Sequence, residues 1–166
     1  DFRQAKGVYI MDETQDIALH HQYIAEIFSE LVEEGLLVSA YSTAPEKLDT
    51  AEIPAQYTLT GSANETNEFG EREEYVVRVY RVQVSVIPTG QANPTEREQL
   101  GRELLERCRK QLKRFTQLND CPRVYEHRVL GDSGIVILPE FGMKYVGFEI
   151  RLEVTYSELI DFADNN

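Results

Sequence analysis

The sequence predicts an α+β fold, with a mostly antiparallel sheet of four or slightly more strands and two long helices packed on one face. Residues 146–156, "VGFEIRLEVTY", alternate between apolar side chains and charged or small ones, as a half-buried strand does. Residues 94–118 instead have apolar side chains at helical spacing, and a second such run lies near the N-terminus. The order helix, strand, loop, long strand, helix, strand, turn, long strand is typical of this architecture.

Length and composition favour one folded domain over residues 1–166. The chain is 42% hydrophobic and 28% charged, and a chain of this length buries about two-thirds of its unfolded surface. The N-terminal extension 1–13 and the polar tail 158–166 are the segments expected to fray. No apolar run approaches the roughly 20 residues that a membrane-spanning helix needs, which argues against an integral membrane protein and against a membrane partner.

The net charge of −12 bears on nucleic-acid binding. Ordinary DNA or RNA binding depends on Lys and Arg side chains that neutralise phosphates, so this charge argues against it. The charge is compatible with a protein that DNA passes without binding, because like charges repel.

Residues 14–35 form the first predicted helix. Its apolar side chains recur at helical spacing, and Gly35 is placed to end it. His20 and His21 are adjacent, so they point about 100° apart and cannot hold one metal ion as an i, i+4 pair would. We expect them to be histidines of the helix surface.

Residues 36–74 are predicted to contain little regular structure. Residues 36–54 cross the molecule irregularly, and residues 55–62 form a short strand. Residues 63–74, "ANETNEFGEREE", are predicted to be a mobile acidic loop because they contain little to bury. The residues of interest in this loop are Glu65, Glu68, Phe69, Glu71, Glu73 and Glu74.

The second long strand and second long helix follow. Strand 75–88 has its even positions facing the core, but its start is apolar on both sides, which predicts either two covered faces or a bulge near Tyr80. In helix 94–118, Thr95 and Glu98 are predicted to form a capping box. A strand at 123–130, a turn at 131–134 and a hairpin arm at 135–141 lead to the last strand.

No residue pattern argues for catalysis, a cofactor or a metal site. Ser133 lies in "GDSG", but Gly, Asp and Ser are the residues that turns use. No glycine-rich phosphate loop is present. The two cysteines, Cys108 and Cys121, are too few for a disulfide framework and fit a reducing cytoplasm. We therefore expect the protein not to be an enzyme. The charged faces of the long strands are left with three possible roles: solvation, a reactive surface, or contact with another copy of the chain.

The order of these elements resembles the tail terminator proteins of long-tailed bacteriophages, the lambda-type family. The resemblance covers about residues 14–157 and rests on "IPAQYTLTG", on "YVVRVYRVQVSVIP" and on the closing strand from Phe148 to Tyr156. This chain departs from the family in being longer and in its extra N-terminal segment.

The resemblance implies a virion protein, made in the host bacterial cytoplasm, whose homo-hexameric ring caps the tail tube. Its partners would be the tail tube protein and the head–tail connector or neck proteins, with DNA passing through the channel unbound. The acidic loop would hang toward the tube. The charged strand faces would meet other subunits, and the candidate interface residues are Arg78, Arg81, Gln83, Glu149, Arg151 and Glu153.

Two other functions stay open. The sequence is also compatible with another head–tail connector or a tail completion protein, which use similar small subunits. It is further compatible with a small-ligand-binding α+β domain or an uncharacterised enzyme. A ring protein would form defined oligomers, whereas a ligand-binding domain would be a monomer or dimer with a closed pocket.

Overall fold

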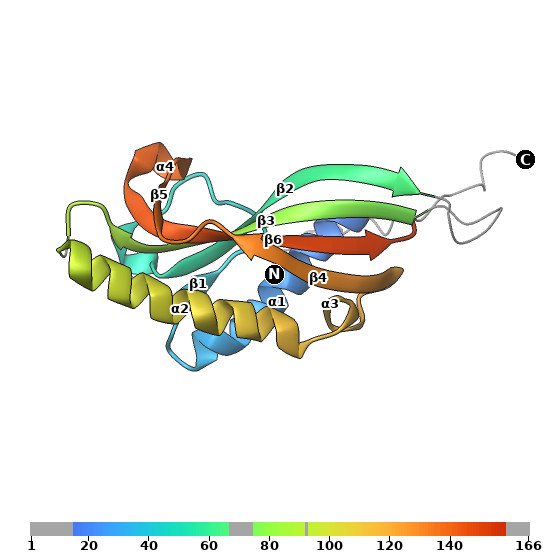
Figure 1. Cartoon of the computed structure of the whole chain (residues 1–166), viewed down its shortest axis with the longest axis horizontal. Helices are drawn as coiled ribbons and strands as arrows, with labels where there is room; N and C mark the ends of the chain where they lie inside the picture. Colours follow the sequence, from blue (N-terminus) through green and yellow to red (C-terminus); the bar gives the residue numbers. More distant parts are fainter. Residues whose placement is uncertain (1–14, 67–74, 92, 159–166) are drawn as a thin grey trace, which may run out of the picture.

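Six strands form one mixed sheet in the computed structural model, which describes residues 15–66, 75–91 and 93–158 (Figure 1). The strands follow the order β1-β2-β3-β6-β4, and β5 also pairs with β6. Their bounds are β1 (Ser39–Ala40), β2 (Ala55–Thr66), β3 (Tyr75–Pro88), β4 (Val124–Asp132), β5 (Val136–Leu138) and β6 (Tyr145–Tyr156). Strand β1 runs parallel to β2, and the other pairings are antiparallel. The predicted α+β class is confirmed, and the sheet has six strands where four or slightly more were expected.

Two long helices, α1 (Asp16–Glu33) and α2 (Pro94–Arg114), lie together beneath the sheet (Figure 1). Both contribute buried side chains to the main core cluster, which also contains the inward side chains of β3 and β6. The shorter helical segments are η2 (Thr50–Glu52), α3 (Gln117–Asp120) and α4 (Glu140–Met143). The molecule is thus a sheet with its long helices on one face.

The inward face of β6 is the centre of the core. Its even-numbered side chains from Val146 to Tyr156 are all buried, and those from Phe148 to Val154 are fully so. Ile150 lies across from Val82 of β3, in antiparallel register. The alternation of the sequence therefore predicted the buried face correctly, because side chains of a strand point to opposite faces in turn.

Strand β3 keeps one phase past Tyr80, which is fully buried on the helix side. A bulge is found on the partner strand β2 and not on β3, because the register of β2 with β3 shifts between Thr60 and Ala63. The other alternative, two covered faces, is met only in part, since Val77 and Val79 are half-buried. Gly61 lies in this bulge, and a Cβ there would be 2.3 Å from the Val79 carbonyl oxygen. The bulge therefore depends on glycine at this position.

Helix α2 begins at Pro94 as predicted, but its N-cap residue differs and the helix ends earlier than predicted. The Asn93 side chain, and not Thr95, accepts a hydrogen bond from the Glu96 backbone N–H at 2.9 Å. Pro94 follows at the first helical position, where its missing N–H costs nothing. The helix ends at Arg114, four residues before the predicted end at Leu118.

A left-handed turn replaces the expected last turn of the helix. Gln117, Leu118, Asn119 and Asp120 all have φ between 50° and 61°. Leu118 is fully buried within this turn, and its backbone N–H donates to Nδ1 of His127 at 2.8 Å. The burial of Leu118 and the histidine contact offset a conformation that costs an L-residue roughly 1–2 kcal/mol.

Glycine at position 117 should stabilise the fold. Gln117 is exposed and has φ 54°, so Gln117→Gly removes the cost of the left-handed conformation without loss of packing. We expect a gain of about 1 kcal/mol in the free energy of unfolding, measured by urea denaturation. Glu103→Gly, at an exposed position inside α2, is the matched control and should cost about 1 kcal/mol. A loss of stability in Gln117→Gly would contradict a left-handed turn in solution.

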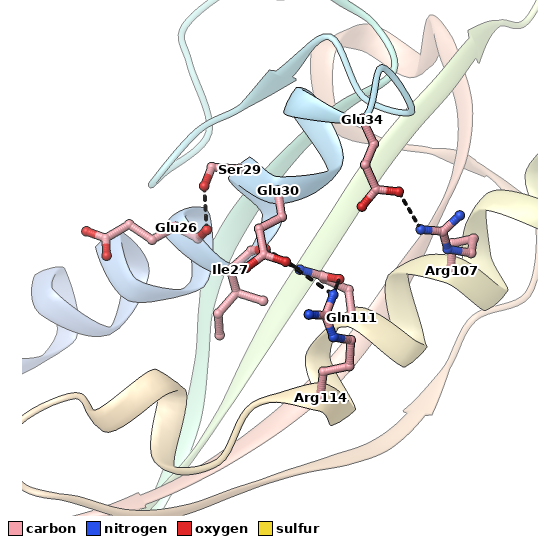
Figure 2. A network of polar contacts seen from close by, with 8 residues as sticks. All are labelled: Glu26, Ile27, Ser29, Glu30, Glu34, Arg107, Gln111 and Arg114. Atoms are coloured by element: carbon pink, nitrogen blue, oxygen red, sulfur yellow. Dashed lines mark hydrogen bonds and ion pairs between the residues drawn. The ribbon is translucent and has the colours of Figure 1, made fainter.

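A polar seam joins α1 to α2 at the surface of the helix layer (Figure 2). Gln111 is 2% exposed and donates to the Ile27 carbonyl oxygen at 2.7 Å. Arg114 pairs with Glu30 at 3.2 Å, and Arg107 pairs with Glu34 at 2.8 Å. These pairs engage the acidic side chains that face α2, namely Glu30 of α1 and Glu34 directly after it.

Candidate functional site

The face of the sheet opposite the long helices carries most of the predicted interface residues. Arg81 lies directly across from Arg151, and Gln83 across from Glu149, in the register of β3 and β6. We call the uncovered part of this surface the open face. It consists of Leu59, Val77, Val79, Arg81, Arg128, Glu149, Arg151, Glu153 and Thr155. Neither long helix covers it (Figure 1).

Three ion pairs involve residues of the open face, and one of them joins Arg81 to Glu140 of α4 at 3.9 Å. Glu149 accepts a hydrogen bond from Nε of Arg81 at 2.9 Å and another from Nε2 of Gln83 at 2.8 Å. Glu153 pairs with Nη2 of Arg128 at 2.8 Å. The Arg128 side chain is 65% exposed, so its pair adds at most about 1 kcal/mol to the stability of the subunit. These pairs therefore define the charge arrangement of the surface and contribute little to the stability of the fold.

Arg151 differs from the other charged residues of the open face. It is exposed, and within the described part of the chain no carboxylate lies within ion-pair distance of it. Its Nη2 lies 3.0 Å from the point where a Cβ on Gly131 would be, so the side chain reaches across β4 at its glycine. Its direct neighbour across the strands is Arg81, and like charges in that position repel. Arg151 therefore places a cation in the centre of the open face with no counter-ion among the described residues.

One end of this side of the sheet is covered. Leu48, Ala55, Tyr57 and Tyr145 form a second buried cluster, and Phe141 packs against it. Gln83 lies at this end and is 1% exposed. The covering segments come from the irregular crossing after α1 and from α4. The open face therefore begins beyond Gln83, at Arg81 and Glu149.

The structure brings four of the six predicted interface residues together on the open face: Arg81, Glu149, Arg151 and Glu153. Gln83 is on the same side but buried. Arg78 is on the opposite side, because it is three residues from Arg81 and side chains alternate along a strand. Its guanidinium donates to the Tyr156 hydroxyl at 3.3 Å and to the Gly61 carbonyl at 3.0 Å. Grouping Arg78 with the open face was wrong.

Arg78 instead lines an open depression of about 690 Å³ beside the start of α1. His21, Thr60 and Tyr156 are among its other lining residues. The depression also reaches Gln15, which borders the residues outside the described part of the chain. It is open and not the closed pocket that a small-ligand-binding domain would need.

The adjacent histidines are buried, contrary to the expectation of surface positions. His20 is fully buried and shares a hydrogen bond of 2.5 Å with the Tyr80 hydroxyl. Burial lowers the pKa of His20 to about 4. His21 contacts Thr60 Oγ1 at 2.9 Å and the Ser42 carbonyl at 2.8 Å, and burial lowers its pKa also. His20 lies one helical turn before Ile24 on the buried side of α1, as helical spacing could have indicated. His21 is also covered by the irregular crossing, which contacts it at Ser42 and which helical periodicity alone could not reveal.

The predicted acidic loop is only partly described. Residues 63–66 belong to β2 and pair with Tyr75–Arg78, so the strand is longer than predicted. Glu65 lies there and is exposed. The remaining residues of interest in the loop, which are Glu68, Phe69, Glu71, Glu73 and Glu74, lie outside the described residues.

The serine and cysteine side chains considered in the sequence analysis have structural roles. The Ser133 hydroxyl accepts a hydrogen bond from the Glu149 backbone N–H at 2.9 Å, which ties its turn to β6. Burial raises the pKa of the Cys108 and Cys121 thiols to about 12, so both are unreactive near neutral pH. Residues 15–66, 75–91 and 93–158 contain no group of three or more His, Cys, Asp or Glu side chains placed to hold a metal ion.

No known protein-family model matches this chain, and no curated protein is detectably similar to it. Across the described ranges, no helix has the length and apolar character needed to cross a membrane. The open face, defined by geometry alone, is thus the main guide to function.

Proposed function

We propose that this protein is the tail terminator of a long-tailed phage, whose homo-hexameric ring caps the tail tube, stops its polymerisation and joins it to the neck. The observation that carries the proposal is the open face. A two-layer domain leaves one face of its sheet without helices, and here that face holds a mixture of half-buried apolar side chains and charges centred on Arg151. Such a surface suits contact with another protein subunit.

Contact through the face is favoured over contact through the sheet edges. The edge strand β4 has register shifts beside Tyr125 and Leu130, and β2 has one between Thr60 and Ala63. Bulges of this kind twist an edge and disfavour the addition of a further strand. Self-assembly of this domain would therefore use the open face.

The charge of the protein agrees with a position around DNA. At −12, the protein repels a duplex more than it binds it, so DNA could move through a ring of such subunits. The element order that underlies the resemblance to lambda-type terminators, from α1 through β3 and α2 to β6, also supports the proposal.

The proposal is tested by the mass of the assembled protein and by its effect on tail tubes. We expect native mass spectrometry to detect a closed hexamer, alone or on addition of the tail tube protein of the same virion. We also expect the protein to stop tube growth, so that electron micrographs show tubes of limited length.

The alternatives give different results. A ring that binds connector proteins but leaves tube growth unchanged would favour a connector or completion protein. A monomer that neither assembles nor affects tubes at any concentration would overturn the proposal.

A further inference from the structure

The open face carries a cation, Arg151, without a counter-ion among the described residues. The helix layer of the same subunit carries exposed carboxylates of the opposite charge. Helix α1 contains no Lys or Arg over Asp16–Glu33. Its Glu30 side chain and the adjacent Glu34 are paired with arginines of α2, as described above. Glu26 and Glu33 are exposed, and neither forms an ion pair within the described part of the sequence. We call Glu26 and Glu33 the acidic stripe.

The acidic stripe lies on the outer side of α1. The residues Ile24, Ile27, Phe28 and Leu31 are buried and face the sheet. Glu26 and Glu33 are seven residues apart, which corresponds to two helical turns, so they share one side of the helix. Figure 2 shows the Glu26 side chain directed away from α2. The acidic stripe and the open face therefore belong to opposite surfaces of the two-layer domain.

We infer that the open face of one subunit packs against α1 of the next, with Arg151 meeting the acidic stripe. Among the described residues, Arg151 has no carboxylate partner and is repelled by Arg81, whereas Glu26 and Glu33 have no cationic partner. A second copy of the protein satisfies both groups at once. This inference rests on the proposed function and specifies which surfaces of the subunit meet.

The symmetry of this contact follows from its geometry. A front surface that binds a back surface is a heterologous interface, and repeated heterologous contacts form a ring when the rotation between subunits closes. A contact between two open faces would be isologous and would stop at a dimer. The front-to-back arrangement is therefore the one that can produce a hexamer.

Two charge-reversed proteins test the contact. The front variant carries Arg151→Glu, so its open face is acidic and its α1 is unchanged. The back variant carries Glu26→Arg and Glu33→Arg, so its α1 is basic and its open face is unchanged. Each variant alone brings like charges together and should need at least a tenfold higher concentration than the unaltered protein to assemble. Both should keep the circular dichroism spectrum of the unaltered protein, because all three positions are exposed.

Mixing the two variants should restore assembly. The acidic open face of the front variant fits the basic α1 of the back variant, and the unchanged surfaces of the two fit each other. Native mass spectrometry should then detect rings with equal numbers of front and back variants. The charge-matched controls are Arg102→Glu for the front variant and Glu98→Arg with Glu103→Arg for the back variant, and both should assemble normally. These positions of α2 are exposed and form no ion pair with any described residue.

The outcomes separate this inference from the proposed function. If the unaltered protein never forms a ring, the proposed function itself fails. If it forms rings and the back variant forms them equally well, then α1 is not the partner surface and the front-to-back contact is overturned. Assembly of the front variant by itself at the normal concentration would also overturn it.

Discussion

Ile150→Asp should leave the protein unable to fold. Ile150 is fully buried in the middle of β6, between Val82 of β3 and Asp132 of β4. A carboxylate there would be out of reach of water and would lie across from an existing carboxylate. Burying such a charge costs several kcal/mol, which is comparable to the total stability of a small domain.

The neighbouring position provides the control. Arg151 follows Ile150 but points to the open face and is exposed, so Arg151→Asp should change the free energy of unfolding of the subunit by less than about 0.5 kcal/mol. Soluble yield and thermal melting followed by circular dichroism distinguish the two variants. A soluble Ile150→Asp protein with a cooperative melt would contradict the assignment of the buried face.

The difference between these two positions was predictable because it depends on alternation alone. Alternation along 146–156 assigned the apolar side chains of β6 to the core, and the structure buries each of them. The same rule would have separated Arg78 from Arg81, since three residues along a strand reverse the face. Arg78 and Arg81 were grouped because both are charged, but strand geometry places their side chains on opposite faces.

Features that depend on distant contacts were not predictable. The end of α2 at Arg114 requires a left-handed turn, which Leu118 burial and His127 stabilise from another part of the sequence. The cover over Gln83 comes from segments without periodicity, so the sequence did not indicate that this polar residue would be buried. Periodic patterns report the face of an element but not what packs against it.

The burial of His20, which lies one helical turn before Ile24 on the buried side of α1, has a consequence for stability in acid. The ring is enclosed by Tyr80 and Tyr156, with its centroid 4.4 Å from that of Tyr156. Its Nε2 has no hydrogen-bond partner in the described structure. Desolvation is the main reason that the pKa falls from 6.5 to about 4; Asp16 opposes this shift, while His21, Arg123 and Arg78 reinforce it.

Acid should therefore destabilise the fold through His20. Between pH 6.5 and pH 4 the unfolded state binds a proton at His20 that the folded state does not, so stability falls as the pH decreases through this window. The loss is about 2 kcal/mol by pH 5 and on the order of 3 kcal/mol by pH 4, at about 1.4 kcal/mol per pH unit. The lowered pKa of His21 adds a loss of the same sign.

His20→Gln isolates this effect, because glutamine keeps a polar group beside Tyr80 but does not titrate. The substitution lowers stability at every pH through changed packing, so the informative quantity is the difference in the free energy of urea unfolding between pH 7.5 and pH 5. Carboxylates begin to titrate near pH 5, but they are the same in both proteins, so their contribution cancels when the two differences are compared. We expect this difference to be smaller by about 2 kcal/mol in His20→Gln than in the unaltered protein. Equal differences in the two proteins would mean that His20 is protonated as readily in the folded state as in the unfolded state.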